Sequence, residues 1–228
     1  MLISSGDMLL SALFIIGLFQ LFWLSVVLVR KGLNPSLIRL CLTVLFSIWL
    51  LMWPAYEDSR VILASLALLV LPIILSFRQN KPYARHLKLA WHSVPQGSSE
   101  PAPWLMVLLS LWIAAQLFHY APELGLGVAL SLSVGWSLAE LLDKSKRGLR
   151  LGLKMHPRQT LAGHLFLVLV VSFACVWSLQ LYHGLPWQQF YVATMIAGLM
   201  ASAVRALLMK GWNMPLSVLA MSAVLWLL

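Results

Sequence analysis

The sequence predicts an all-α, polytopic transmembrane helical bundle of about eight spans. Hydrophobic residues make up 61% of the 228-residue chain and charged residues only 10%, whereas soluble domains contain roughly 45–50% and about 25%. The apolar residues also fall into continuous runs long enough to cross a bilayer as helices. A chain this short cannot bury so much apolar surface in one soluble core. The composition therefore argues against a soluble enzyme and against a nucleic-acid-binding domain.

Each span needs about 20 predominantly apolar residues. The first run lacks the basic start and the small-residue cleavage site of a signal peptide, so we interpret it as a retained span. The second carries Arg39 at its edge, and the last is the shortest. The eight predicted spans are Met8–Val29, Ile38–Pro54, Val61–Phe77, Trp104–Tyr120, Leu124–Leu142, Thr160–Leu181, Trp187–Met209 and Met214–Leu228.

The basic residues predict the orientation. With eight spans, all of the 16 Lys and Arg residues except Arg60 fall on one side of the membrane. Cytoplasmic loops carry such an excess, so we expect the basic loops in the cytoplasm and both termini outside. The net charge of +9 is then mainly a topology signal, with binding of anionic lipid headgroups or of a nucleotide as the alternative.

Aromatic residues mark the ends of the predicted spans. Trp and Tyr side chains favour the interface between membrane and water, so the sequence assigns them an anchoring role only. They are Trp53, Tyr56, Tyr120, Tyr182 and Trp187 on the outer side and Trp104 and Trp212 on the inner side.

Two cytoplasmic loops divide the chain. Residues 1–103 are predicted to hold three spans and a basic loop at 78–103, whose middle, Tyr83–His92, has the pattern of an amphipathic surface helix. Residues 104–228 are predicted to form a five-span bundle with a second basic loop at 143–159. Either loop is a candidate docking site for a membrane protein partner.

Small residues recur in the fifth and seventh predicted spans, where they allow helices to approach closely in lipid. We therefore expect both spans to be internal. The residues include Gly125, Gly127, Gly135, Ala197, Gly198 and Ser202.

Three charged residues lie close to predicted membrane depth: Glu140, Asp143 and Arg205. Charges there are expensive and are candidates for function. Glu140 and Asp143 share a helix face, and Mg²⁺ is typically held by one or two carboxylates with substrate phosphates. The alternative is that one carboxylate pairs with Arg205 as a structural contact. The candidate phosphate or headgroup ligands are Lys144, Lys146, Arg147, Arg150, Lys154 and Arg158.

Other chemistry finds little support in the sequence. No histidine pair has metal-binding spacing, and no Walker A or GxGxxG motif is present. Cys41 and Cys175 lie inside apolar runs, which is typical of buried thiols.

The stretch Gly135–Leu165, GWSLAELLDKSKRGLRLGLKMHPRQTLAGHL, resembles the core of the phytol and dolichol kinases, distant relatives of phosphatidate cytidylyltransferase. That family has Gly-Asp-x-x-Ala at the end of one span and, after a basic loop, Lys-Thr/Ser-x-Glu-Gly at the start of the next. A C-terminal segment, Ser202–Ala220, resembles the family's Val-Glu-Ala-Leu…Gly-x-Asp-Asn…Pro. The matching residues are Gly135, Leu138, Ala139, Thr160, Leu161, Gly163, Val204, Ala206, Leu207 and Gly211.

The acidic positions of that pattern are all changed. The resemblance implies that the family acids hold Mg²⁺ and the nucleotide triphosphate, and phosphoryl transfer needs such charge neutralisation. The departures are Trp136 for Asp, Gln159 for Lys, Ala162 for Glu, Arg205 for Glu, and Asn213-Met214 for Asp-Asn.

Three functions therefore stay open. The favoured one is a non-catalytic subunit or pseudoenzyme on a lipid-kinase-like or cytidylyltransferase-like scaffold. The second is a diverged Mg²⁺- and CTP-dependent transferase acting on a lipid alcohol or lipid phosphate, with Glu140 and Asp143 as catalytic candidates. The third is a small transporter. We expect the protein to lie among membrane lipids in a bacterial inner membrane.

Overall fold

The described part of the chain is helical and contains no strand. The computed structural model describes residues 4–34, 37–38, 41–43, 50–58, 61, 64–65, 67–68, 103–144, 149–153, 158–184, 188–208 and 211–227. An isolated antiparallel bridge joins Arg150 to Thr160 across a loop. The all-α prediction is confirmed for these residues.

The helices follow the predicted apolar runs. Segments α7, η2 and α8 are consecutive and form one continuous helix, of which η2 is a π-helical section. The elements are α1 (Ser5–Arg30), the 3-10 turn η1 (Trp53–Ala55), α6 (Pro103–Leu117), α7 (Pro122–Leu130), η2 (Ser131–Trp136), α8 (Ser137–Lys144), α9 (Leu161–His183), α10 (Gln188–Leu207) and α11 (Asn213–Leu225).

Four helices are long and apolar enough to cross a membrane: Ser5–Arg30, Pro122–Lys144, Leu161–His183 and Phe190–Leu207. The apolar helices Leu105–Leu117 and Asn213–Leu225 are shorter. About half of the predicted span Ile38–Pro54 and most of Val61–Phe77 fall outside the described residues, and the loop 78–103 almost entirely so. The chain thus has the helices of an integral membrane protein, and the count of eight spans stays a prediction.

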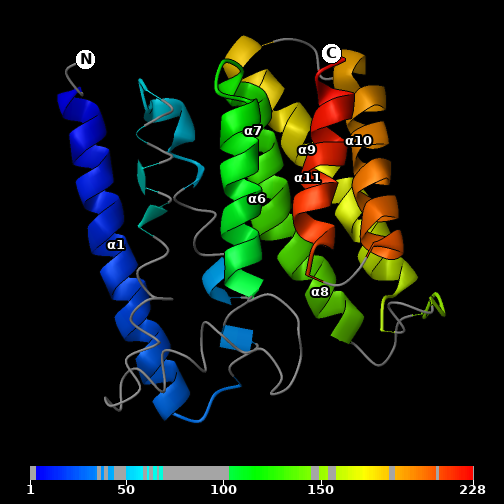
Figure 1. Ribbon diagram of the computed structural model, residues 1–228, viewed down its shortest axis with the longest axis horizontal. Coiled ribbons are helices and arrows are strands. Elements are labelled where there is room, and N and C mark those ends of the chain that lie inside the picture. Colours follow the sequence, from blue (N-terminus) through cyan, green and yellow to red (C-terminus); the bar gives the residue numbers. More distant parts are fainter. Residues whose placement is uncertain are drawn as a thin grey trace.

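The helices lie side by side in an up-and-down arrangement (Figure 1). Helix α9 packs against α7, α8 and α10, and α11 packs against α10 and α6. The start of α1 and the end of α11 lie at one end of the bundle, which we call the terminal end (Figure 1). The end of α8 and the start of α9 lie at the opposite end, which we call the loop end.

The outer surface is strongly apolar. On α1, Phe19 is 59% and Trp23 is 69% exposed, and on α9 Phe173 is 71% exposed. Soluble monomers rarely expose large contiguous apolar patches, whereas hydrocarbon solvates such side chains. This surface agrees with a bundle immersed in lipid.

Glycines let α9 lie close to α7 and α10. A Cβ on Gly127 of α7 would lie 2.8 Å from the Cα of Cys175, and one on Gly198 of α10 would lie 2.9 Å from the carbonyl oxygen of Val168. Within the spanning window, 72% of Pro122–Lys144 is buried but only 28% of Phe190–Leu207. The fifth predicted span is therefore internal, as expected. The seventh is peripheral, and its small residues pack against the bundle on one face only.

Candidate functional site

Polar side chains from three helices meet inside the loop end of the bundle. We call this group the buried polar cluster. Helix α8 and the end of η2 supply one side, the start of α9 supplies the middle, and α10 supplies the other side. Its members are Trp136, Asp143, Gln159, Thr160, His164, Ser202 and Arg205.

A buried ion pair joins α8 to α10. The Arg205 Nη2 donates to Asp143 Oδ2 at 2.6 Å, and the two side chains are only 4% and 9% exposed. Water screens such a pair weakly, and each partner depends on the other because an unpaired buried charge is strongly unfavourable. The sequence left Glu140 and Asp143 as alternative partners of Arg205. The structure pairs Arg205 with Asp143.

The same carboxylate accepts hydrogen bonds from the residue at the start of α9. Thr160 is the N-cap of this helix, and its Oγ1 accepts a hydrogen bond from the Gly163 amide at 3.1 Å. The Thr160 amide and hydroxyl both donate to Asp143 Oδ1, at 2.8 and 2.9 Å. A negative charge at a helix N-terminus is favourable because the amides and the helix dipole point toward it. Glycine is favoured at position 163, since a Cβ would overlap Asp143 Oδ1 and lie 3.1 Å from the carbonyl oxygen of Ala139.

A second chain of hydrogen bonds connects the start of α9 with α10. The Gln159 Nε2 donates to the carbonyl oxygen of Arg205 at 3.1 Å, so its Oε1 is free to accept from His164 Nε2, 3.0 Å away. The other ring nitrogen, Nδ1, lies 2.7 Å from Ser202 Oγ. Gln159 and His164 are 7% and 6% exposed. Buried polar groups are stable when their partners are supplied in this way.

Trp136 covers the Arg205 guanidinium. The centre of that group, Cζ, lies 5.3 Å from the centroid of the indole ring, within the range of a cation–π contact. The Arg205 Nη1 is buried and has no hydrogen-bond acceptor among the described residues. The arginine is thus held by one carboxylate and one aromatic face.

The two acids of α8, Glu140 and Asp143, have different partners. Segment η2 covers Ser131–Trp136 and lies just before α8, and π-helical insertions are frequent at functional sites. Asp143 faces α9 and α10, whereas Glu140, one turn earlier, forms a half-exposed ion pair with Lys144 at 3.3 Å. The two predicted catalytic candidates therefore do not converge on one ligand.

Those predicted phosphate ligands that the structure describes lie on the surface. Lys144, Arg150 and Arg158 are exposed at the loop end. The two arms of the loop pair with each other, because the Leu151 amide donates to the Gln159 carbonyl oxygen at 3.2 Å and the Leu161 amide to that of Leu149 at 2.9 Å. Lys146, Arg147 and Lys154 lie outside the described residues.

The buried polar cluster does not fit a magnesium ion. Mg²⁺ demands several oxygen ligands in octahedral geometry, but both oxygens of Asp143 already accept from Thr160 and Arg205. Arg205 also places a positive charge where the cation would lie. No group of three or more His, Cys, Asp or Glu side chains suited to a metal occurs in the part of the chain that the structure describes.

The hydrogen bonds of Gln159, His164 and Ser202 were not anticipated from the sequence, in which no histidine pair has metal-binding spacing. One signal was available. His164 lies one turn after Thr160 in an otherwise apolar run, so a polar partner on a neighbouring helix was to be expected.

Comparison with known proteins adds no relative: no protein-family model, curated protein or solved structure matches the chain. Some positions at which the sequence departs from the kinase-like pattern meet in space. Trp136, Gln159 and Arg205, three of its departures from the family pattern, all belong to the buried polar cluster.

Proposed function

We propose that the protein is a non-catalytic subunit of a bacterial inner-membrane complex, built on a scaffold related to the lipid-alcohol kinases and cytidylyltransferases. The observation that carries this proposal is the state of Asp143. This carboxylate is fully engaged by Arg205 and Thr160, so it ties three helices together and is not available to a metal or a phosphate.

The substituted acids agree with this role. Trp136 and Arg205 stand where the resembled family has acids, and here they stack on one another. An indole and a guanidinium replace two negative charges with a contact that needs no bound metal. This contact links η2 to α10 without a nucleotide or a cation.

The loop end provides the surface for partners. Lys144, Arg150 and Arg158 are exposed there, and basic residues at a cytoplasmic membrane face attract anionic lipid and acidic protein segments. We place this end in the cytoplasm and both termini outside. A reporter fused after Leu228 should then be active on the outer face, and cytoplasmic activity would contradict this topology.

The proposal is tested by purifying the tagged chain in mild detergent and identifying the proteins and lipids that remain bound. We expect one protein partner in a fixed ratio. The variant Arg150→Gln/Arg158→Gln should lose most of it, because it removes two exposed charges from the loop at 143–159. The control Arg30→Gln/Lys31→Gln removes two exposed charges from another loop and should retain the partner.

An enzyme would behave differently. The chain would purify alone and transfer phosphate from CTP to a lipid alcohol in the presence of Mg²⁺, and Asp143→Asn or Glu140→Gln would abolish the transfer. That result would overturn the proposal and favour the diverged transferase.

A further inference from the structure

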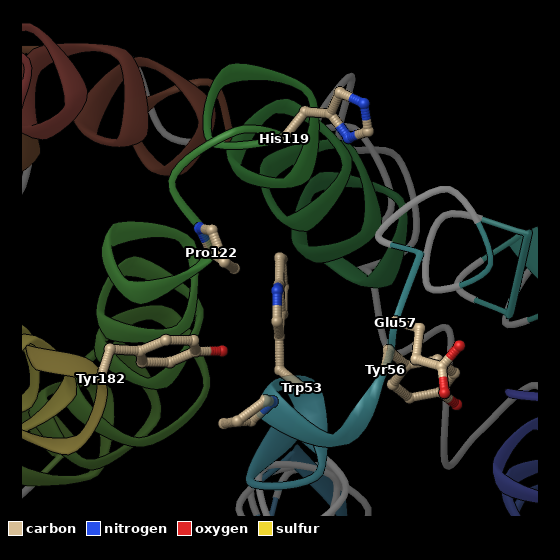
Figure 2. A pocket seen from close by; sticks show the side chains of 7 residues that line it. Trp53, Tyr56, Glu57, His119, Pro122 and Tyr182 are labelled. Carbon is tan, nitrogen blue, oxygen red and sulfur yellow. The ribbon is translucent and has the colours of Figure 1, made fainter. Parts of the chain in front are cut away.

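A small pocket opens at the terminal end of the bundle, far from the buried polar cluster. It has a volume of about 100 Å³ and lies where η1, the end of α6, the start of α7 and the end of α9 meet. Figure 2 shows side chains from these separate segments around it. The lining includes Trp53, Tyr56, Glu57, His119, Pro122 and Tyr182.

Trp53 forms a rigid wall of this pocket. It is 2% exposed, and its ring is set against Gly125 of α7, where a Cβ would lie 3.0 Å from the indole Cζ2. Tyr182 extends from the end of α9 with its hydroxyl directed toward the indole (Figure 2). Packing thus fixes the aromatic wall before any ligand arrives, which lowers the cost of binding.

Two hydrogen-bonding groups of this wall are unsatisfied in the described part of the protein. The indole Nε1 of Trp53 and the hydroxyl of Tyr182 are buried and have no partner among the described residues. Leaving such a group unsatisfied costs about 1–3 kcal/mol. Both can donate a hydrogen bond, and a ligand oxygen that reaches them from the pocket would satisfy them.

The surroundings of the pocket are acidic. Glu57 is exposed at its rim, and its backbone is held in place because its amide donates to Asp7 Oδ1 at 3.0 Å. Asp58 and Glu123 lie at the same end of the bundle. The Lys and Arg residues that the structure describes belong to the ends of α1, α8 and α10 and to the segments that follow α1 and precede α9, and these helix ends lie toward the loop end (Figure 1). Among the described residues the charges near the pocket are therefore acidic, a distribution that attracts a cation, and Arg60 lies outside the described residues.

The chemistry of the lining favours an organic cation over a metal. Ca²⁺ and Mg²⁺ take six or more oxygen ligands, whereas Glu57 is the one carboxylate among the lining residues. Aromatic faces with a nearby acid are the usual receptor of substituted ammonium groups. The volume of about 100 Å³ suits a headgroup, since pockets for larger ligands measure roughly 300–1,000 Å³.

We propose that this pocket binds a small ammonium group of the choline or ethanolamine type. The aromatic wall and Glu57 hold the positive charge. An oxygen of the same molecule, a hydroxyl or a phosphodiester oxygen, accepts from Trp53 Nε1 and the Tyr182 hydroxyl. The molecule is either a soluble amino alcohol or the headgroup of a zwitterionic lipid.

The test uses the full chain in nanodiscs of phosphatidylglycerol, which has no ammonium group, and measures choline binding by saturation-transfer NMR. We expect saturable binding that the uncharged tert-butyl isostere of choline does not show. Glu57→Gln should weaken choline binding about tenfold, because it removes the charge and preserves the shape. The matched control Asp58→Asn removes a neighbouring acid that does not line the pocket and should change the affinity little.

Tyr182→Phe provides a second, conservative variant, since it removes only the hydroxyl and should also weaken choline. Absence of saturable choline binding to the folded chain, equal binding of the isostere, or equal effects of Glu57→Gln and Asp58→Asn would overturn the proposal. Where choline binds as expected, adding phosphatidylethanolamine to the nanodiscs identifies the source. Competition assigns the pocket to a lipid headgroup, and an unchanged affinity assigns it to a soluble amine.

Discussion

Replacing Asp143 by Asn should destabilise the bundle strongly. The substitution preserves size but removes the negative charge that faces Arg205 Nη2 at 2.6 Å. Arg205 is then left as a buried cation, with the indole of Trp136 as its remaining described contact. Removing one partner of a buried ion pair typically costs about 3–5 kcal/mol. An amide oxygen can still accept from Thr160, so we expect about 3 kcal/mol.

The control is available one turn away on the same helix. Glu140 and Lys144 form an ion pair whose side chains are 36% and 43% exposed. Exposed pairs of this spacing contribute about 0.3–0.5 kcal/mol. Glu140→Gln makes the same acid-to-amide change as Asp143→Asn, so the difference between the two variants isolates the effect of burial.

The assay is equilibrium unfolding of the purified chain in mixed micelles, with increasing sodium dodecyl sulfate and far-UV circular dichroism as the readout. A double-mutant cycle with Arg205→Met should show strong coupling to Asp143→Asn, because removing both charges removes the unpaired one. The reasoning is refuted if Asp143→Asn unfolds within about 0.5 kcal/mol of Glu140→Gln, or if the coupling with Arg205 is absent.

Two glycine substitutions give further predictions in the same assay. Gly163→Ala should cost about 1–3 kcal/mol by overpacking, because its Cβ would displace the Asp143 carboxylate, 2.4 Å away; unchanged stability would contradict the placement of that carboxylate. Gly127→Ala should cost a similar amount, since its Cβ would meet the backbone of Cys175 at 2.8 Å and force α7 away from α9. Gly17→Ala is the control for both, because nothing lies within 4 Å of its Cβ, and it should be neutral or stabilising by up to about 1 kcal/mol.

Much of the fold was predictable because lipid restricts the backbone to few solutions. An apolar run must satisfy its own amides, so Leu161–His183 is a helix whatever its neighbours are. The length of a run does not predict which helix lies inside the bundle. Small residues mark both α7 and α10, yet only the helix containing α7 is largely buried.

The site was predictable only in part, because its geometry depends on rotation about helix axes. The sequence identified Glu140, Asp143 and Arg205 as the charges at membrane depth, and spacing placed both acids on one face. Which acid meets Arg205 depends on the rotation of α8 about its axis, and the π-helical section just before α8, Ser131–Trp136, has no clear signature in a single sequence. The pocket beside Trp53 and Tyr182 was missed since aromatic residues at span ends are expected as simple anchors.

The π-helical section has a consequence for how this chain tolerates change in length. A π-helical turn holds about one residue more than an α-helical turn, so losing one residue from Ser131–Trp136 can be taken up by closing that turn. Each residue of an α-helix advances the side chains by about 100°, so losing one residue from α7 would instead rotate α8 against the start of α7 by roughly that angle. Asp143 would then face away from Arg205, and the carboxylate and the guanidinium would both lose their partner in a single event. A substitution in α7 alters one contact, whereas a one-residue deletion there changes the phase of every contact that follows. The helical phase between Pro122 and Lys144 is therefore under tighter constraint than the identity of most residues in it.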